Sequence, residues 1–213
     1  MRGSNYGGYT SVAVQDGTLN DGRIRLEAAD AGYSCNLTLS GVLTNGPTGL
    51  IDSQVGSFGD RVISGTLVNQ GLLDATPFFI TYYGTYEVAG GQAVGAINFF
   101  HVTVRQTASP AQPNTLRLMG DSTLLTDNLA NVELWVNGSG PVGTATLSVV
   151  DGAVNQGTLR AESTDGGYVS QIISAGTLSN ASAGQMRFAA GAGGPRSFTG
   201  QLLNSGMVTV DPG

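Results

Sequence analysis

The stretch VISGTLVNQG, residues 62–71, decides the fold, because variants of it recur along the chain at a nearly constant spacing. Each copy places a short apolar segment and an asparagine between glycines, as in LTLSGVLTNG up to Gly46 and SVVDGAVNQG up to Gly157. The six marker asparagines are Asn20, Asn45, Asn69, Asn155, Asn180 and Asn204. Their steps are 25 and 24 residues in the first half and again 25 and 24 in the second. A fixed period of roughly 20 to 50 residues is typical of a solenoid.

The interval between Asn69 and Asn155 is 86 residues long and lacks a clear copy of the phrase. Two weaker copies fit inside it, YEVAGGQAVGAIN up to Asn98 and LRLMGDSTLLTDN up to Asn128. With these two the chain has about eight coils. The larger steps predict longer coils over residues 75–150, and insertions in a solenoid often form loops on its binding face.

Apolar residues alternate with polar ones within the copies, as at Leu37 and Leu39 and at Val208 and Val210. This is the period of a β-strand, and glycine or proline interrupts most stretches before a helix could form. A left-handed β-helix has shorter coils, and leucine-rich repeats have denser leucines. The sequence therefore predicts an all-β right-handed parallel β-helix. We expect one domain over residues 5–213, preceded by Met1–Ser4, which resemble an expression leader.

The marker asparagines have an architectural explanation. Stacked coils place the same turn residue above itself, so each asparagine amide can donate to one neighbour and accept from the other. Asparagine also tolerates the left-handed backbone that a sharp turn requires. We therefore predict a structural ladder rather than a chemical role for these six residues.

Composition narrows the functional classes. The 213 residues carry a net charge of −6, and all nine basic residues are arginines without a basic cluster, so nucleic acid is not an expected partner. No apolar run is long enough for a membrane-spanning helix. Cys35 is the only cysteine, and the turn residues Asp30 and Asp165 lie several coils apart. The sequence thus predicts no disulfide, no metal site and no cofactor.

The segments GTLVNQG (65–71), SGVLTNG (40–46) and GTLSN (176–180) resemble the repeats of bacterial secreted β-helix proteins, namely filamentous-haemagglutinin-like exoproteins and autotransporter passenger domains. The resemblance implies a secreted or cell-surface protein with a structural or adhesive function. Because the repeat is already in progress by Tyr6 and the chain ends within two turns of the last marker, we also expect neighbouring coils of a longer parent chain to be partners.

Aromatic residues supply the candidate binding sites. Eight of the 15 aromatics lie in the central coils, and rings that stack on sugars are typical of glycan recognition. We expect Tyr82, Tyr83 and Trp135 to contact a polysaccharide or a host-surface glycan. A second candidate surface is a row of aromatics beside glycines in equivalent loops, formed by Tyr33 and Tyr168 together with Tyr9, Phe58 and Tyr83.

Two alternatives stay open at the level of the sequence. The first is a polysaccharide lyase or hydrolase, for which the central region offers Glu87, His101, Arg105, Arg117, Asp121, Asp127 and Glu133. No paired-acid motif is present, so we expect a non-catalytic protein and assign no catalytic residue. The second alternative is a segment of a phage-type fibre, which would form trimers.

Overall fold

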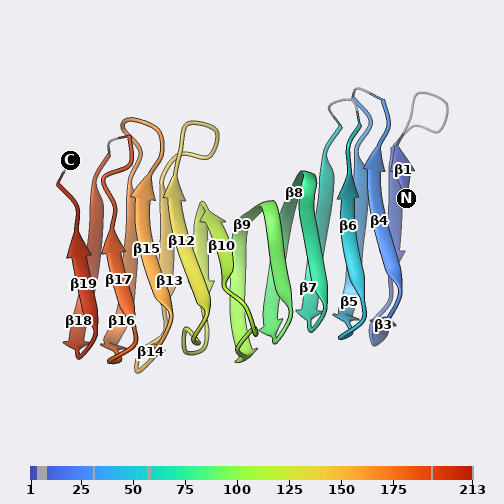
Figure 1. Cartoon of the computed structure of the whole chain (residues 1–213). Coiled ribbons are helices and arrows are strands. Elements are labelled where there is room, and N and C mark those ends of the chain that lie inside the picture. The colour runs from blue at the N-terminus through green and yellow to red at the C-terminus, as the bar shows by residue number, and fades with distance from the viewer. Residues whose placement is uncertain (4–8, 31, 57–58, 193, 213) are drawn as a thin grey trace. The chain divides into compact units, whose positions relative to one another are not determined.

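A computed structural model describes residues 1–3, 9–30, 32–56, 59–192 and 194–212 and shows an all-β chain of parallel strands (Figure 1). The chain divides into two compact units, Met1–Asn98 (unit 1) and Phe99–Gly213 (unit 2), where the sequence predicts one domain. Each unit is a parallel β-solenoid, and the two together contain about eight turns. The predicted fold class is thereby confirmed.

Unit 1 winds through three faces. Its strands are β1 (Arg2–Gly3), β2 (Thr10–Val14), β3 (Thr18–Asn20), β4 (Arg23–Ala28), β5 (Cys35–Asn45), β6 (Leu50–Gln54), β7 (Arg61–Asn69), β8 (Leu72–Ala89) and the first part of β9 (Gln92–Ala108). Face A contains β2 and the first halves of β5 and β7; face B contains β3 and their second halves; face C contains β1, β4, β6 and the start of β8. Gly65, with a φ of 117°, forms the bend between faces A and B in β7. A side chain there would collide with the backbone of Leu39 in the previous coil.

Unit 2 repeats this plan. Its strands are the rest of β9, β10 (Asn114–Met119), β11 (Asp121–Leu124), β12 (Val132–Gly138), β13 (Ala145–Val149), β14 (Val154–Asn155), β15 (Thr158–Ser163), β16 (Ser170–Asn180), β17 (Gln185–Phe188), β18 (Arg196–Asn204) and β19 (Met207–Val210). Face C consists of β10, β12, β15, β17 and β19, paired in that order. Face A contains β11, β13 and the first halves of β16 and β18, and face B contains β14 and their second halves.

Columns of inward side chains form the core of each unit. In unit 1, Leu37, Ile63 and Tyr82 occupy one column in successive coils, and none is more than 1% exposed. In unit 2 a similar inward column lies on face C and consists of Leu116, Leu134, Leu159 and Met186, again at most 1% exposed. Burying each such side chain contributes about 2 kcal/mol, so the alternation read from the sequence is the main source of stability.

The asparagine ladder of unit 1 is present. The Nδ2 of Asn20 donates to the Oδ1 of Asn45 at 2.8 Å, and the Nδ2 of Asn45 donates to the Oδ1 of Asn69 at 2.9 Å. Each amide also donates to a backbone carbonyl near the start of the next face C strand, for example Asn45 to Leu72 at 3.2 Å. The amides are almost fully buried, so these bonds satisfy groups that would otherwise destabilise the fold.

Unit 2 carries a longer ladder with the same geometry. Asn128 donates to Asn155 at 2.7 Å, Asn155 to Asn180 at 2.8 Å, and Asn180 to Asn204 at 2.7 Å. The ladder begins with a residue that the sequence does not single out: the Nε2 of buried Gln106 donates to the Oδ1 of Asn128 at 2.8 Å. Glutamine thus replaces asparagine at this position.

The weaker copy ending at Asn98 is wrong, whereas the one ending at Asn128 is confirmed. The residue paired with Asn69 in the next coil is Val88, whose side chain cannot accept a hydrogen bond. The Nδ2 of Asn69 donates instead to the Oη of Tyr86 at 2.9 Å. A valine and a tyrosine hydroxyl therefore replace the expected asparagine.

The prediction of longer coils over residues 75–150 is also wrong at two places, where the pairing of neighbouring strands shows shorter coils. Asn69 pairs with Val88 in unit 1, a step of 19 residues, and Asn114 pairs with Val132 in unit 2, a step of 18. The reason is the missing link between faces C and A. Strand β8 runs through 18 residues without interruption, and only Gly120 separates β10 from β11, whereas β15 ends at Ser163 and β16 begins at Ser170.

Within the described residues, no helix has the length and apolar character needed to cross a membrane.

Candidate functional site

Tyr82, predicted to bind glycan, is instead a core residue. Its side chain is 0% exposed, and its Oη lies 2.9 Å from the carbonyl oxygen of Gly65 and 2.6 Å from that of Thr85. Burial raises the pKa of the Tyr82 hydroxyl above its ordinary value. Strand alternation explains the error, because of two adjacent tyrosines only one can face outward. The outward one is Tyr83, which is 38% exposed and remains a candidate.

The predicted row of loop aromatics forms only in part among the described residues of unit 1. Tyr9 and Tyr33, two of its members, pack against each other with ring centroids 5.6 Å apart. Tyr83 is not in their column, because it pairs with Ser64, which in turn pairs with Thr38. Phe58 lies outside the described residues. In unit 2, Tyr168 is half-buried between β15 and β16.

Trp135, on face C of unit 2, is held between two arginines. Arg117, Trp135 and Arg160 pair in register on β10, β12 and β15. The guanidinium carbons of Arg117 and Arg160 lie 5.2 and 4.5 Å from the indole centroid, a cation–π arrangement from two neighbouring coils. The indole Nε1 is buried and has no hydrogen-bond partner in the described part of the chain. The arginines of the two neighbouring coils thus pack against the half-buried Trp135, and glycan contact by its ring stays a prediction.

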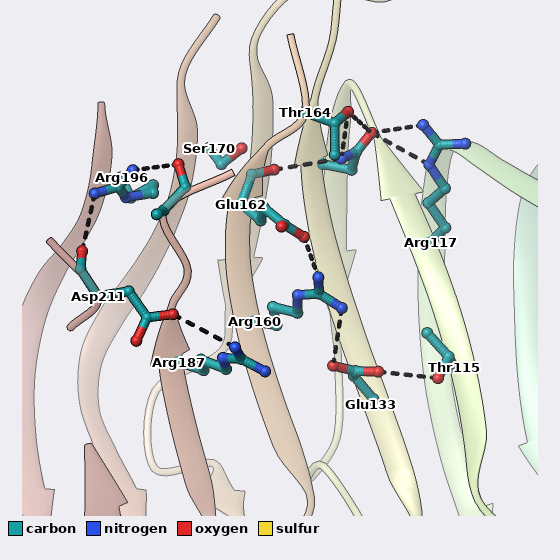
Figure 2. Close-up of polar contacts among 12 residues, drawn as sticks. Thr115, Arg117, Glu133, Arg160, Glu162, Thr164, Ser170, Arg187, Arg196 and Asp211 are labelled. Atoms are coloured by element: carbon teal, nitrogen blue, oxygen red, sulfur yellow. Dashed lines mark hydrogen bonds and ion pairs between the residues drawn. The ribbon is translucent and has the colours of Figure 1, made fainter. Parts of the chain in front are cut away.

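Polar side chains form a network on the strands that carry Arg117, Trp135 and Arg160, and Figure 2 shows its charged and polar members. Arg160 contacts the carboxylate of Glu162 on its own strand and that of Glu133 on β12, the latter at 3.7 Å. The other oxygen of Glu133 accepts a hydrogen bond from the Oγ1 of Thr115 at 3.0 Å. Three successive strands of face C are thus connected through one carboxylate, and the orientation of Glu133 is fixed.

Toward the other end of the strands the network continues through amide and hydroxyl groups. Burial lowers the pKa of Arg117, whose Nε and Nη2 donate to the Oδ1 of Asn137 at 3.2 and 2.8 Å. Asn137, 0% exposed, donates from its Nδ2 to the Oγ1 of Thr164 at 3.0 Å. This arrangement orients the arginine beside the indole ring.

A surface groove of about 480 Å³ lies on face C of unit 2 beside this network. Along it lie four side chains in register from four consecutive strands: Thr115, Glu133, Thr158 and Gln185. Pro113, Asn131, Gln156 and Ala183 border the groove near the asparagine turns, and Arg187 lies at one end. Hydroxyl, amide and carboxylate groups on a shallow wall can donate to and accept from a polyhydroxylated ligand.

Sequence reasoning missed this groove because none of its residues is aromatic. Equal spacing from the marker asparagines does not reveal the column either. Thr158 follows Asn155 by three residues, whereas Glu133 and Gln185 follow Asn128 and Asn180 by five. Of the predicted binding residues, only Trp135 lies on the same face as the groove.

The acids considered for catalysis in the central region occupy different environments. Glu133 lines the groove. The Oδ1 of Asp127 accepts from the backbone N–H of Val154 at 2.8 Å. The backbone N–H of Asp121 donates to the Nδ1 of His101 at 3.1 Å. His101 has a φ of 50°, an uncommon backbone conformation for a residue other than glycine. Asp121, Asp127 and His101 are not among the residues that line the groove.

Comparisons with protein-family models, with curated proteins and with solved structures give no match to this chain.

Proposed function

We propose that this protein is a non-catalytic, secreted or cell-surface structural β-solenoid that contacts polysaccharide through the face C groove of unit 2. The single observation that carries the proposal is the column of hydrogen-bonding side chains along that groove, Thr115, Glu133, Thr158 and Gln185. The extracellular setting and the adhesive function are supported by the resemblance of the repeats to those of filamentous-haemagglutinin-like exoproteins and autotransporter passenger domains. Tyr83 and the half-buried Tyr33 and Tyr168 are secondary contact candidates.

The test is a glycan-array screen of the purified chain and two variants. Thr158→Arg places a long side chain across the middle of the groove without changing the core, because Thr158 points outward beside the buried Leu159. The matched control is Ser179→Arg on face B of the same unit. We expect binding by the wild type and the control and at least a tenfold loss for Thr158→Arg. Equal binding by all three proteins would exclude the groove, and silence of the wild type would contradict glycan binding.

A polysaccharide-cleaving enzyme is the second candidate, and one observation favours it. Glu133 and Glu162 both contact the guanidinium of Arg160, so one arginine lies between two carboxylates. Glycosidases use pairs of carboxyl groups separated by roughly 5 to 10 Å. The appearance of new reducing ends or unsaturated products with wild-type protein, and their loss in Glu133→Gln, would favour this function over simple binding.

A further inference from the structure

The groove presents one polar side chain from each of four coils. Thr115, Glu133, Thr158 and Gln185 occupy equivalent positions on β10, β12, β15 and β17, which are hydrogen-bonded neighbours. Adjacent strands in a sheet are separated by about 4.8 Å, so the four side chains form a row with that period along the stacking direction. This spacing is close to the length of one sugar unit in an extended polysaccharide chain.

The charges beside the groove are balanced. Glu133 forms an ion pair with Arg160 at 3.7 Å, and Arg187, at the end of the groove, forms one with Asp211 at 3.4 Å. Thr115, Thr158 and Gln185 are neutral, as are Asn131 and Gln156 on the border. A strongly anionic polymer would have to compete with Glu133 and Asp211 for the arginines, whereas hydroxyl groups can bond to the paired side chains as they stand.

All four positions along the row are polar, and Glu133 is the only charged one among them. A site for a chain end or for one particular sugar is expected to enclose that sugar with converging polar groups. This groove is instead open and presents one polar side chain from each of four coils. Its geometry matches the interior of a polymer better than the end of one.

We propose that the groove selects an unbranched, uncharged polysaccharide in an extended conformation, which lies along the stacking direction with one sugar unit per coil. This inference rests on the proposed function and deepens it. In a curved, coiled glycan such as an α-1,4-linked glucose chain, successive sugars turn away from the row of side chains. In a branched glycan, the branches prevent successive sugars from lying along the row.

The experiment is calorimetric titration of the whole chain with oligosaccharides of one to six sugars. The extended series are β-1,4-linked glucose, xylose and mannose oligomers. The α-1,4-linked glucose oligomers are a matched series of the same composition with a curved chain. For at least one extended series we expect affinity to rise several-fold with each sugar up to about the fourth and then level off. The curved series should show no such rise.

The variant Thr158→Arg divides the row and should abolish the rise beyond two sugars, while Ser179→Arg should preserve it. A length-independent affinity, equal binding of the curved series, or tighter binding of polygalacturonate than of every uncharged oligomer would overturn the inference and leave glycan binding itself intact. Absence of binding to these oligomers and to every glycan of the array would overturn both.

Discussion

The same column of face C carries different chemistry in the two units. In unit 1 it contains Arg25, Asp52 and Asp74, and in unit 2 Arg117, Trp135, Arg160 and Arg187. Asp52 is only 2% exposed and contacts Arg23 and Arg25 at 2.6 and 3.3 Å, so polar groups in unit 1 are satisfied by one another.

In unit 2 an indole ring stands among the arginines, and the neighbouring column borders a groove. The inward columns and the asparagine ladders are nevertheless alike in the two units. The inward and turn residues, which are alike in both units, thus stabilise the fold. The outward residues differ between the units, and we place the proposed binding site among them.

The largest expected effect is a loss of stability when the asparagine ladder, which both units share, is interrupted. Asn45→Ala in unit 1 and Asn155→Ala in unit 2 each remove the same buried hydrogen bonds and leave their partners unsatisfied. Each should lower the free energy of unfolding by about 3 kcal/mol in urea titrations. Asn204→Ala is the control, because Asn204 is exposed, and it should cost about 1 kcal/mol or less. A clear difference between the two buried variants would show that the ladders are not equivalent.

Alkaline pH should lower the stability of unit 1 but not that of unit 2. Burial raises the pKa of Tyr82 and Tyr86, both in unit 1, above the value of about 10 found in unfolded chains. Their contribution to stability is complete below about pH 10 and is lost at higher pH, because only the unfolded state then releases these protons. At about pH 11 each tyrosine should lower the free energy of unfolding by about 1.4 kcal/mol, so unit 1 loses about 3 kcal/mol.

Urea unfolding followed by two probes checks this expectation. The fluorescence of Trp135, the only tryptophan, reports on unit 2, and far-UV circular dichroism reports on both units. Between pH 7.5 and about 11 the dichroism should gain an early phase while the fluorescence midpoint stays fixed. Coincident transitions at both pH values would contradict the assignment of the alkaline sensitivity to unit 1.

A smaller effect is expected at the indole. Trp135→Leu keeps an apolar side chain between Arg117 and Arg160 but removes the aromatic ring that both guanidiniums contact. We expect a loss of about 1.5 kcal/mol in unfolding free energy and a weaker affinity for glycan, because the arginine that orients Glu133 loses its support. Unchanged stability would show that the stack contributes nothing beyond burial.

The smallest effect concerns the equivalent column of unit 1. Asp52→Asn removes the charge that Arg23 and Arg25 share, but these side chains are 50% and 41% exposed and can be solvated instead. The expected loss is about 1 kcal/mol, and it should decrease as salt is added, with no change in glycan affinity. A loss of glycan binding would show that unit 1 contributes to the site.

The sequence predicts the fold well because the ladder and the inward columns obey simple periodicities. It fails where another group performs the same task. Tyr86 and Gln106 replace asparagine as hydrogen-bonding groups, so a search for asparagine selects Asn98 instead. The short central coils could not be predicted either. In these coils the loop between faces C and A is missing, and no particular residue type in the sequence marks its absence. The groove escapes prediction because its four residues are 18 to 27 positions apart and share only an orientation.

The most direct test of the central claim is backbone amide NMR of the chain titrated with a glycan that binds in the array. The account predicts that the perturbed amides cluster along β10, β12, β15 and β17, around Thr115, Glu133, Thr158 and Gln185. Perturbations centred on Tyr83 or elsewhere in unit 1, with these four strands unchanged, would contradict it.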